Sequence, residues 1–182
     1  MKAGWQAAAV LLACALVARA QESAPAFAWE VPKARAGMFK EIGMLDRERD
    51  EYATNLAVCA VNRVAAAKAS AASLDEARRL LGTALLLSPR NRKAVVAAFQ
   101  LGKGIVPEPA EGDYSPPVFA RLLLARGQLL EKLEGADNVL LARVFIDLAA
   151  RLDPKNEEAA YVSEIRRLDH GPVDWKALTD SP

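Results

Sequence analysis

Apolar residues recur every three or four positions along most of this chain, which is the spacing of one face of an α-helix. The first such run extends from Leu45 to about Ser70. Prolines, glycines and residues that cap helices divide the rest of the chain into further runs. The expected helices span 74–87, 92–101, 116–133, 138–152 and 157–168. A period of two, which is typical of strands, occurs only at 27–31, so the sequence predicts an all-α body of antiparallel helix pairs.

Specific residues mark where these helices begin and end. Ser73 and Glu76 have the spacing of a capping box, in which the serine caps the first turn and the glutamate reaches back. Ser115 followed by Pro116 fits a cap and a first helical position. Before it, residues 105–114 contain two prolines and a glycine and form the longest irregular segment of the body.

A ten-residue phrase occurs twice. Residues 85–94 read LLLSPRNRKA and residues 150–159 read ARLDPKNEEA. In each copy Pro89 or Pro154 ends a helix, because proline lacks an amide donor and clashes with the preceding turn. Asn91 and Asn156 are then the expected caps of the helices that follow. Recurrence at a fixed offset predicts stacked units of paired helices.

The spacing before these prolines resembles that of the tetratricopeptide-repeat (TPR) family. The second helix of that repeat has an alanine, a bulky residue four positions later, an alanine three later and a proline five later. This spacing occurs as Ala77-Leu81-Ala84-Pro89 and as Ala142-Ile146-Ala149-Pro154. The resemblance covers 55–169, is weaker in the first helices of the units, and makes 92–133 the most irregular unit. It implies a short TPR-like α-solenoid over 45–169; a plain helical bundle with two similar turns is the alternative.

The resemblance also implies where a partner binds. Family members typically hold an extended peptide or a helix in a concave groove lined by first helices. Carried over by position, the residues that would face this groove are Lys93, Val96, Gln100, Lys103, Glu158 and Tyr161. The lysines and the glutamine can hold a carboxylate through charge-assisted hydrogen bonds. The expected function is a non-catalytic scaffold that binds a protein or peptide; ordinary solvated surface is the alternative for each residue.

Residues 1–20 have the features of a secretory signal peptide. Lys2 precedes an apolar run, and Ala18 and Ala20 are small residues at the positions that determine cleavage. The run is shorter than the roughly 20 apolar residues of a membrane span. The mature protein is therefore expected in the periplasm or outside the cell, with lipid attachment at Cys14 as the competing interpretation.

The segments at the two ends of the mature chain each allow more than one interpretation. Residues 21–44 are expected to form an extended arm, which either lies along its own helices or docks on another protein through Phe27 and Trp29. Residues 170–182 form a short tail. The last long helix has no second helix to complete a pair. Its residues Ala160, Ile165 and Leu168 suggest an alternative function, a structural protein that self-assembles into a homo-oligomer, unless the tail covers them.

The net charge and the few reactive side chains argue against a nucleic-acid-binding protein, a membrane-binding protein and an enzyme. Loss of the signal peptide reduces the 24 basic residues to 22, against 23 acidic residues. A net charge near zero gives no electrostatic case for binding nucleic acid or an anionic membrane. Cys59 is the single mature cysteine, so no internal disulfide is expected. An enzyme that uses Cys59 and His170 is a further hypothesis, but no spacing supports it. Neither a metal nor a cofactor is expected.

Overall fold

Seven α-helices form the computed structural model of the chain, which describes residues 27–33, 38–39 and 41–180. The helices are α1 (Asp46–Ala66), α2 (Ala71–Leu87), α3 (Arg92–Gly102), α4 (Pro116–Leu130), α5 (Ala136–Leu152), α6 (Glu157–His170) and α7 (Trp175–Thr179). No strand occurs within these described ranges, and the all-α prediction is confirmed. In the same ranges, no helix has the length and apolar character needed to cross a bilayer.

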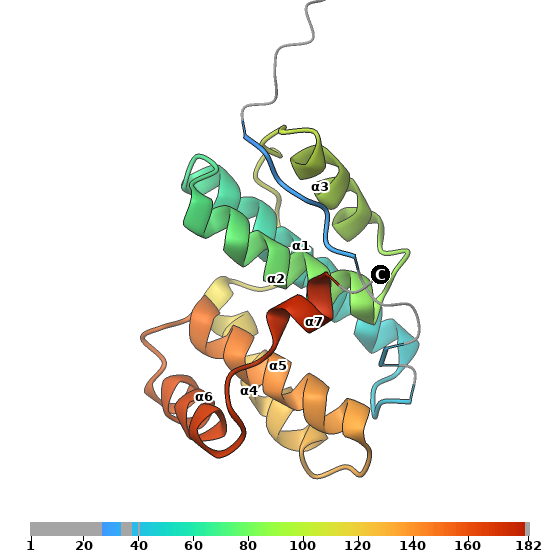
Figure 1. Cartoon of the computed structure of the whole chain (residues 1–182), viewed down its shortest axis with the longest axis vertical. Helices are drawn as coiled ribbons and strands as arrows, with labels where there is room; N and C mark the ends of the chain where they lie inside the picture. Colours follow the sequence, from blue (N-terminus) through green and yellow to red (C-terminus); the bar gives the residue numbers. More distant parts are fainter. Residues whose placement is uncertain (1–26, 34–37, 40, 181–182) are drawn as a thin grey trace, which may run out of the picture.

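The helices pack as two antiparallel hairpins, each with a third helix at its side (Figure 1). α1 pairs with α2, and α4 pairs with α5. α3 lies against α1 and α2, while α6 lies against α5 and α4. The first three helices occupy the upper part of Figure 1 and the next three the lower part.

Side chains of α1 join the two hairpins into one continuous hydrophobic core. The ring of Tyr52 stacks on the ring of Phe145 with 5.3 Å between centroids, and it lies tilted against Phe119 at 5.7 Å. Aromatic contacts of this kind add about 1 kcal/mol each beyond the burial of their area. At the end of α5, the guanidinium of Arg63 donates a hydrogen bond of 2.7 Å to the carbonyl oxygen of Arg151. The hairpins are therefore joined by both apolar and polar contacts.

The repeated phrase folds into the same turn twice. α2 and α5 both contain 17 residues, and they begin 65 residues apart. They end at Ser88 and Asp153 with similar backbone angles, φ −142° and ψ 89° against φ −133° and ψ 83°. In both turns an asparagine, Asn91 or Asn156, accepts a 3.1 Å hydrogen bond from the amide three residues later. The two asparagine caps predicted from the sequence are confirmed.

The capping box predicted at Ser73 and Glu76 is wrong. α2 begins at Ala71, and its cap is Ser70, whose hydroxyl accepts from the amide of Ser73 at 3.4 Å. The chain turns immediately before this cap, where Ala69 has a φ of 54°. The carboxylate of Glu76 does not reach back to the cap but pairs with Arg63 of α1 at 3.5 Å. α1 also ends four residues earlier than expected; the ends of α3 to α6 differ from the expected ones by three residues or fewer.

The irregular unit expected at 92–133 is not a helix pair. α3 packs on the helices that precede it, and residues 103–115 then run back along α1 before α4 begins. Two asparagines of α1 hold this segment. Asn62 exchanges hydrogen bonds of 2.9 and 2.8 Å with the backbone of Ala110, and Asn55 accepts from the amide of Asp113 at 3.2 Å. The segment therefore forms a wall beside α1 instead of a simple connection.

The described part of the arm, residues 27–33, lies along helices of its own chain (Figure 1). The indole of Trp29 packs against the core, and its Nε1 donates to the carbonyl oxygen of Leu74 at 3.0 Å. The amide of Lys33 donates to the carbonyl oxygen of Thr179 in α7 at 2.7 Å, and α7 packs on α2. For these residues the arm covers its own body. The expected signal peptide and Cys14 lie outside the described residues.

Candidate binding cleft

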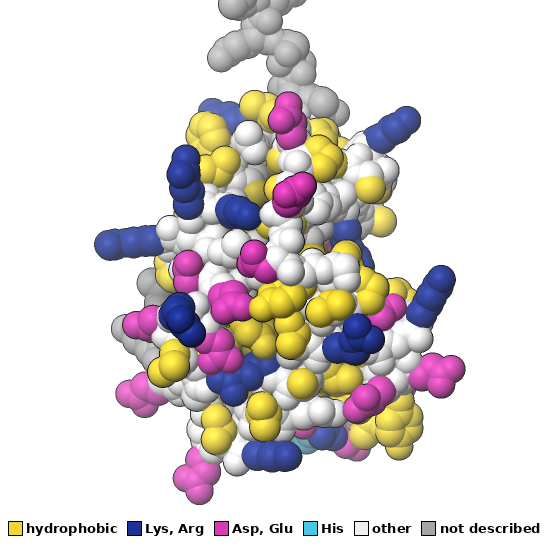
Figure 2. Space-filling view, turned by 180° about the vertical axis from the view of Figure 1, so that it is seen from behind, with side chains coloured by type: hydrophobic (Ala, Val, Ile, Leu, Met, Phe, Trp, Pro, Cys, Tyr) yellow, Lys and Arg dark blue, Asp and Glu magenta, His cyan; other side chains and the backbone are white. Residues whose placement is uncertain are grey.

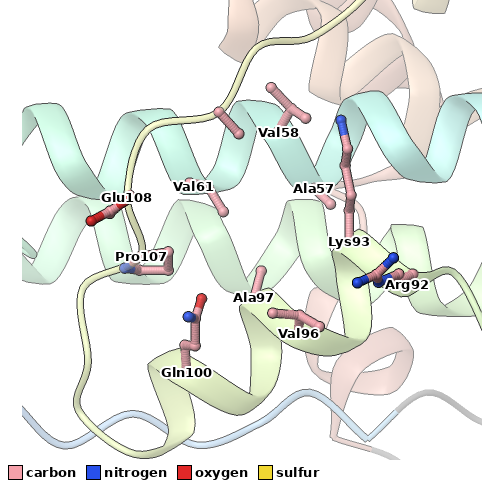
Figure 3. A pocket seen from close by; sticks show the side chains of 11 residues that line it. Ala57, Val58, Val61, Arg92, Lys93, Val96, Ala97, Gln100, Pro107 and Glu108 are labelled. Atoms are coloured by element: carbon pink, nitrogen blue, oxygen red, sulfur yellow. The ribbon is translucent and has the colours of Figure 1, made fainter.

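A cleft of about 350 Å³ lies between α1, α3 and the segment that follows α3 (Figure 3). Ligand pockets in proteins usually measure about 300–1,000 Å³. The cleft is at the lower end of this range, which suits a few residues of an extended peptide better than a helix.

The floor of the cleft is apolar. Val58 and Val61 of α1 and Ala97 of α3 line it and are at most 7 % exposed. Ala57 and Ala97 have no atoms beyond Cβ, so the two helices leave space between their side chains. Val96 stands at the rim, with 46 % of its surface exposed. An apolar side chain of a bound segment would lose its contact with water here, which is the main favourable contribution to such binding.

Polar and charged side chains surround the mouth of the cleft (Figure 3). Glu108 lies at one end, and Arg92 and Lys93 lie at the other. The ammonium of Lys93 donates to the carbonyl oxygen of Glu111 at 3.3 Å and so links α3 to the wall. Within the described ranges neither Arg92 nor Lys93 has a carboxylate at ion-pair distance, so this end keeps a net positive charge. Gln100 offers both a donor and an acceptor to a peptide backbone.

Three of the six predicted groove residues line this cleft: Lys93, Val96 and Gln100. A fourth, Lys103, follows the end of α3 and does not line it. Its ammonium lies 5.9 Å from the centroid of the Phe99 ring, within the range of a cation–π contact.

The other two predicted groove residues lie on α6, at the opposite end of the molecule from α3 (Figure 1). The carboxylate of Glu158 accepts from the amide of Gln128 at 3.5 Å. Tyr161 is 69 % exposed. The structure therefore does not bring the six residues into one groove.

Sequence reasoning missed the residues that form the floor and the wall. One signal was present, because the run of six apolar residues at 56–61 of α1 indicates burial on every side of the helix. The other signal is weaker. Asn55 and Asn62 interrupt the buried surface of α1, and buried amides need hydrogen-bond partners. Nothing in the sequence identified 110–113 as the segment that provides these partners.

Two residues considered for catalysis lie in ordinary surroundings. Cys59 is 6 % exposed, and burial raises the pKa of its thiol to about 11, so the thiol stays protonated at neutral pH. His170 is exposed at the end of α6, and its carbonyl oxygen accepts from Arg143 at 3.3 Å. In the described part of the chain, no cluster of histidine, cysteine and carboxylate side chains has the makings of a metal site.

Comparison with models of protein families, with curated proteins and with solved structures gives no match for this chain.

Proposed function

We propose that this protein is an exported, non-catalytic module that binds other proteins through a short extended segment held in the cleft between α1 and α3. The observation that carries the proposal is the cleft itself, which has an apolar floor and a polar rim. Such a combination provides affinity through burial and orientation through a few hydrogen bonds. Export is proposed from the signal-peptide features of residues 1–20, and periplasm or extracellular space is the proposed location.

The proposed architecture is a short, degenerate TPR-like stack. Supporting features are the two 17-residue helices α2 and α5 with identical spacing, and the two matching turns after them. The seams are made of small residues: Ala77, Ala84, Ala142 and Ala149 have no exposed surface. Small side chains at these positions let the paired helices approach closely. In this proposal α1 and α3 are the first helices that line the binding face.

Peptide selection tests the proposal. Peptides displayed on phage would be selected on the mature chain, residues 21–182, and then measured by fluorescence anisotropy. Val96→Trp should weaken binding at least tenfold, because the indole fills the mouth of the cleft. Val95→Trp is the matched control: Val95 has 45 % exposure on the same helix but does not line the cleft. The proposed site would be refuted if both substitutions weakened peptide binding equally, or if neither changed the affinity of the selected peptides.

A second candidate function is self-assembly through α6, favoured by the exposure of that helix. Ala159 is its only buried residue, whereas Tyr161 and Leu168 are 69 % and 64 % exposed and lie seven positions apart, on one face. The short α7 packs on α2 and leaves this face open. Sedimentation equilibrium distinguishes the candidates: a dimer that Tyr161→Ser with Leu168→Ser converts to monomer supports assembly, and a monomer at all concentrations rules it out.

A further inference from the structure

The outward face of α3 carries a stripe of exposed apolar side chains. Val95, Val96 and Phe99 are 45 %, 46 % and 60 % exposed. Phe99 lies between Arg92 and Lys103 along the same outer face, since residues seven and four positions apart share one side of a helix. We call these five residues the α3 stripe. The upper part of Figure 2, where α3 lies, shows exposed hydrophobic side chains beside Lys and Arg side chains, with Asp or Glu side chains nearby.

Residues 90–106, which contain the α3 stripe, carry charge of one sign. Residues 90–106 include four basic residues (Arg90, Arg92, Lys93 and Lys103) and no acidic residue, although the whole chain is nearly balanced. None of the four forms an ion pair with any described residue. Two exposed apolar residues just past the helix, Ile105 and Val106, extend the apolar surface. Positive charge is therefore concentrated in this stretch of the sequence, although the net charge of the whole protein is near zero.

Folding stability does not explain two of these cations, Arg92 and Lys93. The N-terminus of a helix carries partial positive charge, so Arg92 and Lys93 in the first turn of α3 oppose the helix dipole. The matching helix of the second hairpin shows the favourable choice. α6 follows the same turn and the same asparagine cap, and its first two residues are Glu157 and Glu158. Arg92 and Lys93 therefore cost stability and need another explanation, whereas Lys103 at the C-cap of α3 favours the dipole.

We infer that the α3 stripe is a docking surface for an anionic lipid bilayer, with Phe99 inserted at the headgroup level and the basic side chains on the lipid phosphates. Apolar side chains flanked by lysine and arginine are the composition of helices that lie in a membrane interface. Protein interfaces, in contrast, are depleted of lysine. The ammonium of Lys103 lies over the ring of Phe99, 5.9 Å from its centroid, and pairs with no described carboxylate, so it can bind a phosphate beside the inserted ring.

Vesicle binding by the mature chain, residues 21–182, tests the inference. Flotation with vesicles of phosphatidylcholine alone and with 40 mol % phosphatidylglycerol would be compared at about 50 mM and about 300 mM salt. Binding is expected only to the anionic vesicles and should weaken with salt. Arg92→Gln with Lys103→Gln should lower the partition coefficient roughly thirtyfold, at about fivefold for each charge. Phe99→Ser should lower it about tenfold through lost apolar burial.

Matched variants separate insertion from misfolding. Phe99 is largely exposed, so Phe99→Ser should keep the helical circular dichroism of the parent. Phe99→Trp should bind the anionic vesicles and lose fluorescence when brominated lipids are included. Tyr161→Ser with Leu168→Ser removes equally exposed apolar side chains on α6 and should leave binding unchanged. The inference is overturned if the parent does not bind anionic vesicles, if Phe99→Trp is not quenched, or if Phe99→Ser instead abolishes binding of the selected peptides and leaves lipid binding intact.

Discussion

The two asparagine caps allow a matched experiment on what the repeated turn contributes to stability. Asn156 makes one hydrogen bond through its side chain, accepting from the amide of Ala159. Asn91 makes the same bond and is 4 % exposed. Its Nδ2 also donates to the carboxylate of Asp50 at 3.0 Å and to the hydroxyl of Thr54 at 2.7 Å. Asn91 therefore caps α3 and also ties that helix to α1.

The difference in contacts gives a difference in free energy. Loss of an N-cap costs about 1 kcal/mol, and this is the expected effect of Asn156→Ala. Each lost side-chain hydrogen bond adds about 0.5–1.5 kcal/mol, so the loss of the cap and of the bonds to Asp50 and Thr54 in Asn91→Ala should cost about 2–4 kcal/mol. Serine keeps the cap but removes the amide donors. Asn91→Ser should therefore cost about 1–3 kcal/mol, and Asn156→Ser should be nearly neutral.

Urea denaturation of residues 21–182, followed by circular dichroism at 222 nm, measures these four values. The free energy of unfolding should fall with urea concentration at the same slope in the parent and its variants, so that shifts of the midpoint report stability alone. Equal losses for Asn91→Ala and Asn156→Ala would show that the tie between α3 and α1 contributes nothing. A loss for Asn91→Ser as large as that for Asn91→Ala would show that the cap contributes nothing.

The same variants give a pH dependence with a defined sign. Hydrogen bonds from Asn91 and Ser88 lower the pKa of Asp50 below its ordinary value of 3.8. A carboxylate with a lowered pKa in the folded state contributes stability above its unfolded pKa, and this contribution is lost as the pH falls through the folded value. Asn91→Ala should therefore destabilise the protein more at pH 7 than at pH 3. An equal loss at both values would contradict the role assigned to Asp50.

Three other positions give independent predictions. Glu76→Gln should lower the free energy of unfolding, measured in urea, by roughly 2 kcal/mol. Glu76 is 8 % exposed and pairs with Arg63 and, across the two hairpins, with Arg151 at 3.8 Å. A loss under about 0.5 kcal/mol would contradict this. Cys59 should react with iodoacetamide at pH 8 only in urea, because its pKa is about 11 and it is buried; rapid modification of the folded protein would contradict this. Gly127→Ala should lower the midpoint of thermal unfolding, although alanine favours helices. The added Cβ would lie 3.0 Å from the carbonyl oxygen of Ala142 in α5. An unchanged or higher midpoint would show that the α4–α5 hairpin adjusts without cost.

Local signals in the sequence predicted the helices and the repeated turns. A proline and an asparagine cap act within a few residues of themselves, so the two copies of the phrase fold alike wherever they lie. The capping box failed for the opposite reason. Ser70 and Ser73 are both suitable caps, and the spacing to Glu76 favoured the second. In the structure Glu76 instead pairs with Arg79 of its own helix, with Arg63 of α1 and with Arg151 of α5, and the last two are distant in sequence.

The path of residues 103–115 also depends on contacts distant in sequence. Its prolines and glycines correctly predicted an irregular segment, but irregular backbone has no period that would indicate its direction. That direction is determined by Asn62, which binds Ala110 across 48 positions. The wall of the cleft comes from this segment, so the sequence predicted three lining residues on α3 (Lys93, Val96 and Gln100) and none of the wall.

The helices that follow the two copies of the repeated phrase, α3 and α6, share the turn and the cap but differ in their surface residues. After the same turn and the same cap, α3 begins with Arg92 and Lys93, and α6 begins with Glu157 and Glu158. The backbone needs only the cap and the buried alanine that follows in both helices, so the outward residues are free to differ. The first turn of α6 follows the helix dipole, whereas that of α3 opposes it. Because folding does not favour Arg92 and Lys93 at this place, binding is the better explanation for them: both residues line the cleft, and Arg92 is also part of the α3 stripe.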